Sequence, residues 1–233
     1  EIAETPKYLR WAFAVLDTPG PFEASGAPSF FYITPPSPDW TEKEKEEWLT
    51  TFNYSSLRSI AAHESFPGHY LHHLHSTNLE STIGSIFKSY AHSEGWAHYA
   101  EEIIMEGEYA ENNVCSHLTQ IQEALIRNCR YICSIKMHTQ GMTVAEATAF
   151  FVENAYLENL PASKEAMRGT FDPMYLNYTL GKLLIQKFRN DYKLVKGEHY
   201  TDKLFHDKIL SYGAPPIPLL RELILRHSEG NVL

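Results

Sequence analysis

Two histidines and a glutamate near residue 65 are of the types that bind and use a divalent metal. His63 and Glu64 open the segment HESFPGH, and its second histidine, His69, follows the first by six residues. In the standard H-E-x-x-H motif the histidines are four apart and bind one metal, while the glutamate acts as general base. Six residues on a regular helix turn the two side chains about 240° apart. Pro67 and Gly68 predict that the helix is deformed here, with two extra residues absorbed in a bulge, because proline removes a backbone N–H and clashes with the preceding turn.

The spacing of these histidines is also compatible with other arrangements. An ordinary helix could end at Pro67, and a second, exposed helix could carry the later histidines of the segment HYLHHLH. Within that second helix, His69 and His73 stand at the helical spacing of four and could form a different ligand pair. A third ligand is needed to decide between these alternatives.

Glu94 is the candidate for the third ligand. It lies on a stripe with spacings of three and four that is apolar at both ends and ionisable in the middle: Ile83, Phe87, Tyr90, Glu94, His98, Glu101 and Met105. The pattern places Glu94 on the core side of its helix, where a carboxylate without a partner is costly. A metal held by His63 and His69 would be that partner, and three protein ligands would leave a fourth position for water, as in catalytic zinc sites. A buried salt bridge from Glu94 to an arginine or lysine is the alternative.

The remaining ionisable residues supply candidates for the chemistry beside the metal. Glu64 suits the role of general base, because it adjoins a ligand without being needed as one. A developing oxyanion needs a donor, and Tyr178 is the first candidate, followed by His98 and Arg168. His98 and Glu101 could instead orient metal ligands or substrate, although Glu101 could also be an exposed surface residue.

Three segments together resemble a known bacterial family. They are HESFPGH, SEGWAHYAEE, and Arg168 followed shortly by FDPMYLNYTLGKL. They resemble the family called domain of unknown function 885, and the similarity runs from PSFFYITPP to LSYGAPP, which is most of the chain. Members of that family resemble gluzincin-type zinc metallopeptidases. The resemblance implies the same assignment: zinc on His63, His69 and Glu94, with Glu64 as the base.

The same resemblance bears on the whole protein. Family members generally carry a further N-terminal helical half, and many resemble exported or lipid-anchored proteins. The resemblance therefore implies that this chain is the C-terminal part of a longer protein, exported or lipid-anchored through a segment outside it.

These observations predict a zinc-dependent hydrolase that acts on a peptide or small amide. One alternative is a metallohydrolase of non-peptide amides or esters, since activated water attacks these as readily. Another is a metal-binding or scaffold protein without turnover. Other divalent metals also accept two histidines and a glutamate as ligands.

The elements that must position these residues are mostly helices. Helical periodicity covers residues 56–75, 80–108, 114–139, 144–159, 174–194, 201–211 and 216–227, with breaks that include Pro161. Thr41 and Glu44 fit a capping box. Phe30 to Thr34 predicts a strand or hairpin arm, either an exposed edge strand that pairs with an extended peptide or a packed scaffold strand. The expected fold is a mainly α, zincin-like helical domain with a short strand or hairpin near its N-terminus.

Length and composition set broader limits. The 233 residues, of which 43% are apolar, are enough for one domain over residues 1–233 with its own core. The formal net charge of −9 disfavours nucleic-acid binding, which needs a basic face. No run of 18 apolar residues predicts a transmembrane segment. The oligomeric state does not follow from the sequence.

Overall fold

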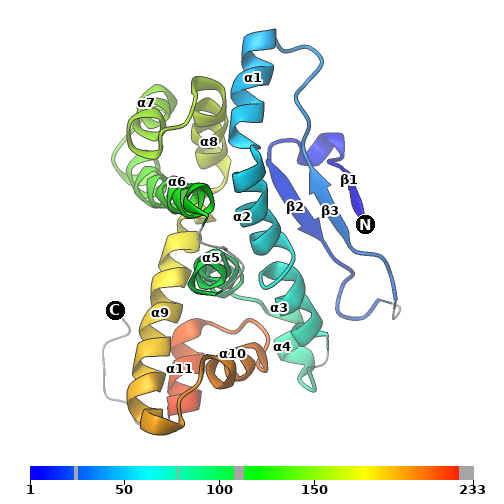
Figure 1. Cartoon of the computed structure of the whole chain (residues 1–233), viewed down its shortest axis with the longest axis vertical. Helices are drawn as coiled ribbons and strands as arrows, with labels where there is room; N and C mark the ends of the chain where they lie inside the picture. The colour runs from blue at the N-terminus through cyan, green and yellow to red at the C-terminus, as the bar shows by residue number, and fades with distance from the viewer. Residues whose placement is uncertain (24–25, 78, 108–112, 226–233) are drawn as a thin grey trace.

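The computed structural model describes residues 1–23, 26–77, 79–107 and 113–225. Most of them are helical, and the strands lie near the N-terminus (Figure 1), which confirms the predicted mainly α fold. The strands are β1 (Ile2–Glu4), β2 (Ala14–Asp17) and β3 (Phe30–Ile33). The α-helices are α1 (Glu42–Thr51), α2 (Tyr54–Glu64), α3 (His69–Ser76), α4 (Thr82–Ile86), α5 (Tyr90–Glu106), α6 (Val114–Thr139), α7 (Val144–Ala155), α8 (Asn159–Phe171), α9 (Asn177–Lys196), α10 (Asp202–Leu210) and α11 (Ile217–Leu225). Short 3₁₀ helices are η1 (Lys7–Leu9), η3 (Pro173–Leu176) and η4 (Gly197–His199).

The three strands form one small sheet in the order β1-β3-β2. β3 is parallel to β1, with Ile2 opposite Phe31, and antiparallel to β2, with Leu16 opposite Phe31. β3 is the strand predicted from the run Phe30 to Thr34. It is hydrogen-bonded on both sides, so the hypothesis that it is an exposed edge strand is wrong. The edges of this sheet are β1 and β2.

Helix α1 is fixed to the sheet by one tryptophan. Trp48 is 1% exposed, its indole N–H donates to the Thr34 carbonyl at 2.9 Å, and its ring stacks on Phe13 at 4.3 Å between centroids. The helix begins at the predicted capping box, in which Thr41 and Glu44 each satisfy a backbone N–H of the other.

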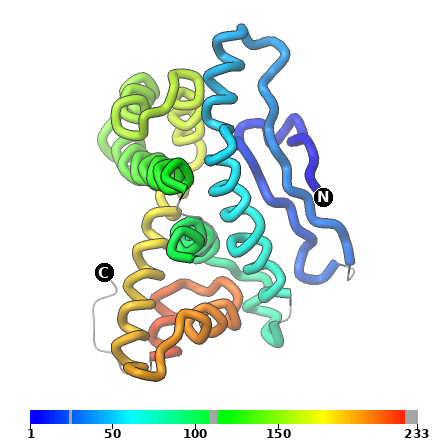
Figure 2. Tube along the Cα trace, viewed as in Figure 1, coloured from blue at the N-terminus to red at the C-terminus, as the bar shows by residue number. Residues whose placement is uncertain are grey.

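Helix α5 lies in the middle of the molecule, with α2 and α3 on one side and α9 on the other (Figures 1 and 2). The backbones of α5 and α9 come very close together at two glycines. A Cβ built on Gly95 would lie 2.4 Å from the Gly181 carbonyl carbon, so only glycine allows the two backbones to come this close.

Two apolar cores flank this central helix. One joins α5 to α9, α10 and α11 through large side chains such as Trp96, Phe188 and Phe205. The other joins α6, α7 and α8 around Phe151. The described part of the chain has no helix long and apolar enough to cross a membrane, in line with the prediction.

Several predicted helix boundaries differ from the structure. The helix predicted over 144–159 ends at Ala155, and α8 lies in a region where no helix was predicted. Pro161 does not break a helix but is the third residue of α8. Its missing N–H falls in the first turn, where backbone N–H groups have no partner within the helix. The single helix predicted over 80–108 is divided, because α4 ends at Ile86 and α5 begins at Tyr90. Residue 108 and residues 226–227 of the predicted helices lie outside the described residues.

Candidate metal centre

The segment HESFPGH forms a break between two helices. α2 ends at Glu64, α3 begins at His69, and the Phe66–Pro67 peptide bond is cis. A Cβ on Gly68 would lie 1.9 Å from the His63 carbonyl oxygen, so this turn requires glycine. The predicted bulge within one helix is therefore wrong, because the chain ends one helix and starts another. The two histidines nevertheless converge, as one shared metal would require, because the centroids of the His63 and His69 rings lie 4.8 Å apart.

Glu94 completes a group of three side chains that could hold one metal. Its Oε2 lies 3.5 Å from His63 Nε2 and 3.4 Å from His69 Nε2, and one ligand atom from each residue lies within 4.8 Å of the others. Zinc–nitrogen and zinc–oxygen bonds of about 2.0–2.1 Å put tetrahedral ligands about 3.3 Å apart. The nitrogen–oxygen distances fit that geometry, and the alternative pair His69 and His73 is not needed to account for a site.

The surroundings of Glu94 also fit a bound cation. Its Oε2 is buried without a hydrogen-bond partner, and among the described residues only His63 and His69 form ion pairs with it. The alternative of a salt bridge to arginine or lysine is therefore wrong. Burial raises the pKa of Glu94, but the two histidines outweigh burial and hold the pKa well below its usual value. Two imidazoles and one ionised carboxylate are a ligand set typical of catalytic zinc.

A second buried carboxylate, Glu101, orients His63. Glu101 has no exposed surface, which excludes the surface alternative, and its Oε1 accepts from His63 Nδ1 at 2.6 Å and from Arg127 Nη2 at 3.0 Å. Burial lowers the pKa of His63, but the neighbouring carboxylates of Glu101 and Glu94 outweigh it and raise the pKa to about 10. Because Nδ1 is engaged, Nε2 is the nitrogen that faces Glu94 and His69. Metal-binding histidines commonly have such a carboxylate partner.

Glu64, the candidate general base, follows His63 as the last residue of α2. It lines a cavity together with His63 and Tyr178, and its Oε2 accepts a hydrogen bond of 2.9 Å from the Leu16 N–H of strand β2. The end of α2 therefore places a ligand and a candidate base side by side, with the edge strand β2 next to the base.

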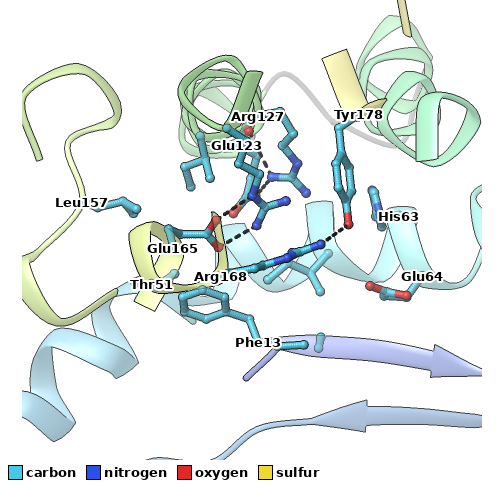
Figure 3. A pocket seen from close by; sticks show the side chains of 15 residues that line it. Phe13, Thr51, His63, Glu64, Glu123, Arg127, Leu157, Glu165, Arg168 and Tyr178 are labelled. Atoms are coloured by element: carbon cyan, nitrogen blue, oxygen red, sulfur yellow. Dashed lines mark hydrogen bonds and ion pairs between the residues drawn. The ribbon is translucent and has the colours of Figure 1, made fainter. Parts of the chain in front are cut away.

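Two of the oxyanion candidates, Tyr178 and Arg168, lie together in this cavity (Figure 3), and His98 lies elsewhere. Tyr178 lines the cavity, its ring lies 5.9 Å from the His63 ring, and its hydroxyl accepts from Arg168 Nη2 at 3.1 Å. The hydroxyl proton of Tyr178 therefore remains available for another acceptor. His98 is 1% exposed, lies 3.5 Å from Glu101 Oε2, and lines no described cavity. Its position fits contact with Glu101 and not contact with a substrate.

The sequence analysis missed the charged residues on the far wall of this cavity: Glu123, Arg127, Arg130 and Glu165. The first three follow spacings of four and three on α6 and are buried. Ionisable residues on the buried stripe of a helix were the signal used for Glu94, and the same signal could have found these three.

Fold and site together define a mainly α domain with a candidate His-His-Glu metal centre beside a charged cavity. The chain belongs to a family described as bacterial protein of unknown function (DUF885), whose model matches residues 1–224. This confirms the family named from the sequence motifs. No curated protein matches the chain.

Two solved structures share the fold. One is described as a "putative lipoprotein of unknown function" from Shewanella oneidensis; it is 30% identical, with a TM-score of 0.82 over 96% of this chain and 40% of that one. The other, a "putative lipoprotein" from Colwellia psychrerythraea, is 21% identical, with a TM-score of 0.83 over 97% of this chain and 37% of that one. The chain thus spans about two-fifths of the length of these relatives.

Proposed function

We propose that this chain carries the catalytic centre of a zinc-dependent hydrolase that cleaves peptides. His63, His69 and Glu94 would hold the metal. The observation that carries the proposal is the buried, unpartnered Glu94 Oε2, which lies 3.4–3.5 Å from two imidazole nitrogens. A carboxylate in this position is stabilised by a cation.

The neighbouring residues fit the steps of hydrolysis. When bound, zinc lowers the pKa of water toward neutrality and polarises a carbonyl. Glu64, adjacent to His63, would take a proton from the attacking water and pass it to the leaving amine. Tyr178 would donate its hydroxyl proton to the oxyanion, because Arg168 occupies the hydroxyl as a donor and leaves that proton free.

The edge strand β2 supports a peptide as the substrate. Ala14 lines the cavity beside Glu64, whereas Leu16 and Thr18 line a second cavity beside His69 and Glu94. The edge of β2 therefore runs past both sides of the candidate metal site. An extended peptide can add to a sheet edge through main-chain hydrogen bonds. The Leu16 N–H of this edge already donates to Glu64, so a peptide would pair with the other main-chain groups of the edge.

The descriptions of the two structural relatives agree with the expectation of export or lipid anchoring. We extend that location to this protein as part of the proposal. Substrates would then be peptides outside the cytoplasm.

The metal site is tested first by metal content. We expect about one zinc per chain by plasma mass spectrometry in protein purified without added metal or affinity tag, and loss of zinc in both His63→Ala and Glu94→Ala. Loss in both variants would establish one site shared by two segments. Zinc that is retained in Glu94→Ala would contradict the three-ligand site.

Turnover is tested separately. Glu64→Gln removes the base but no ligand, so we expect zinc to be retained and peptide hydrolysis to fall by about 10²–10⁴-fold. A panel of peptide, simple amide and ester substrates then separates a peptidase from other metallohydrolases. Hydrolysis that is unchanged in Glu64→Gln would contradict the mechanism.

A further inference from the structure

The cavity beside His63 and Glu64 has a wall of arginines opposite the candidate metal site (Figure 3). It is enclosed by α2, α6, α8, α9 and the residues at the start of β2, and its volume is about 70 Å³. One water needs about 10–15 Å³ on this measure, so the cavity has room for a small polar group such as a carboxylate.

The cavity is lined by Arg127, Arg130 and Arg168. In Arg130 and Arg168, carboxylates bind Nε and Nη2 but not Nη1. Arg130 donates Nε and Nη2 to Glu165, both at 2.7 Å. Arg168 donates Nε and Nη2 to Asp172 at 3.0 and 2.9 Å, and Nη2 also to Tyr178. These bonds fix the direction of each planar guanidinium group.

The other end of each guanidinium group is free. Within the described residues, no hydrogen bond joins Nη1 of Arg130 or Arg168 to any partner. Nε of Arg127 is fully buried and has no hydrogen-bond partner. The Nη1 atoms of Arg130 and Arg168 are not buried in this way, so they are accessible from the cavity. Because both side chains are more than 90% buried and line the cavity, their free N–H groups are available to a molecule in it.

Both arginines lie within a short reach of the candidate metal site. The Tyr178 ring is 5.9 Å from the His63 ring, and Cζ of Arg130 and of Arg168 lies 4.9 and 5.6 Å from the Tyr178 ring. The guanidinium carbons of Arg130 and Arg168 are therefore at most about 11 and 11.5 Å from the His63 ring, or about three residues of extended chain.

We propose that this cavity is a substrate subsite that binds a carboxylate through the free Nη1 groups of Arg130 and Arg168. The proposal rests on the hydrolase function proposed above and names its substrate class: peptides with a carboxylate within three residues of the scissile bond. Two pre-oriented guanidinium ends suit a carboxylate, because charge-assisted bonds to an anion are about twice as strong as neutral ones. The carboxylate would come either from the C-terminus of the peptide or from an aspartate or glutamate side chain.

Binding to the inactive variant Glu64→Gln, loaded with zinc, tests the subsite without turnover. Acetyl-trialanine is compared with its C-terminal amide by isothermal titration calorimetry. Amide-capped acetyl-tripeptides with glutamate or glutamine at each position in turn form the second comparison. We expect the acid to bind about 10- to 100-fold more tightly than its neutral partner in one comparison. The comparison that shows the preference identifies the source of the carboxylate, and equal binding in both would overturn the proposal.

Variants then assign the preference to the cavity. Arg168→Gln leaves Asp172, whose side chain is 18% exposed and can be hydrated. Arg130→Lys keeps a cation beside buried Glu165 but removes the free Nη1. We expect either variant to reduce the acid preference at least fivefold. The matched control is Arg221→Lys, which alters another buried, ion-paired arginine outside the cavity and leaves the preference unchanged. A preference that persists in both cavity variants would overturn the assignment.

The outcomes also separate this proposal from the proposed function. Zinc content and hydrolysis of a neutral, amide-capped peptide test the hydrolase. If those succeed and no acid preference exists, only the subsite is wrong. If zinc is absent, the acid and amide comparison is repeated on the metal-free protein, where a preference removed by Arg168→Gln still supports the subsite and equal binding overturns it.

Discussion

At the scale of single residues, the hydrogen bond between His63 and Glu101 decides which imidazole nitrogen can reach a metal. Glu101 is buried, and Arg127 shares the same carboxylate oxygen. The carboxylate is thus held ionised by one partner while it orients the other. Removing its charge should weaken the metal site without removing a ligand.

We therefore expect Glu101→Gln to lower zinc affinity by about 10- to 100-fold. Glutamine keeps an acceptor for His63 Nδ1 but no longer favours the imidazole as a strong ligand. Competition with a chromogenic chelator measures the change. Glu102→Gln is the matched control, because Glu102 pairs with Lys182 at the surface and makes no contact with His63. Equal affinities in the two variants would show that Glu101 has no part in metal binding.

Residue types and spacing were enough to propose His63, His69 and Glu94 as one group of ligands, because a carboxylate on an apolar helical stripe needs a partner, and the three side chains do lie together in the structure. Residue types and spacing could not decide whether Glu101 is buried or exposed, because a helical stripe gives the direction of a side chain but not what packs over it. The pair Arg130 and Glu165 could not be predicted either, because its partners are 35 residues apart on different helices.

At the scale of elements, the position of Glu94 depends on the crossing of α5 and α9. Gly95, the next residue, lies against Gly181, where an added Cβ would come within 1.8 Å of the Ala91 carbonyl oxygen. A larger residue at either glycine must move the helices apart. The movement would displace Glu94 relative to His63 and His69, which lie on the other side of α5.

Gly95→Ala should consequently destabilise the protein by about 1–3 kcal/mol through overpacking, and weaken zinc binding. Helix propensity alone would predict that Gly95→Ala stabilises the protein, because alanine is favoured over glycine in a helix by about 1 kcal/mol. Urea unfolding measures the balance. Gly84→Ala in α4, where an added Cβ has its nearest neighbours at 3.4 Å, should be neutral or stabilising. A stable Gly95→Ala protein with full zinc affinity would refute this account of the crossing.

The elements themselves were predicted unevenly, for physical reasons. Amphipathic periodicity identified most helices, because each buries one face. It failed at Pro161, since periodicity cannot show whether a proline stands in a first turn or an interior turn. It also could not show that the strand from Phe30 lies in the middle of the sheet, because pairing partners are set by the tertiary fold.

At the scale of the whole molecule, two buried histidines join distant parts of the fold. His72 on α3 bonds through Nε2 to the Gly213 carbonyl at 2.9 Å, and His92 on α5 bonds through Nδ1 to the Pro215 carbonyl at 2.7 Å. They hold the turn before α11 against the helices of the candidate site. Burial, with a smaller effect of His92, lowers the pKa of His72 from 6.5 to about 3, and burial lowers the pKa of His92 to about 4.

These lowered pKa values imply that the protein loses stability in mild acid. Below pH 6.5 the unfolded chain binds protons at both histidines while the folded chain does not, so acid favours unfolding until the pH reaches the folded pKa values. The stabilisation is fully present above pH 6.5 and declines from pH 6.5 to about 4 for His92 and to about 3 for His72. We expect the melting temperature to fall over that range when it is measured with a chelator present, so that loss of metal does not contribute. His72→Gln keeps a side-chain donor near Gly213 but does not titrate, so its melting temperature should be lower at pH 7.5 and fall less steeply. Identical pH dependence in both proteins would show that His72 does not couple folding to protonation.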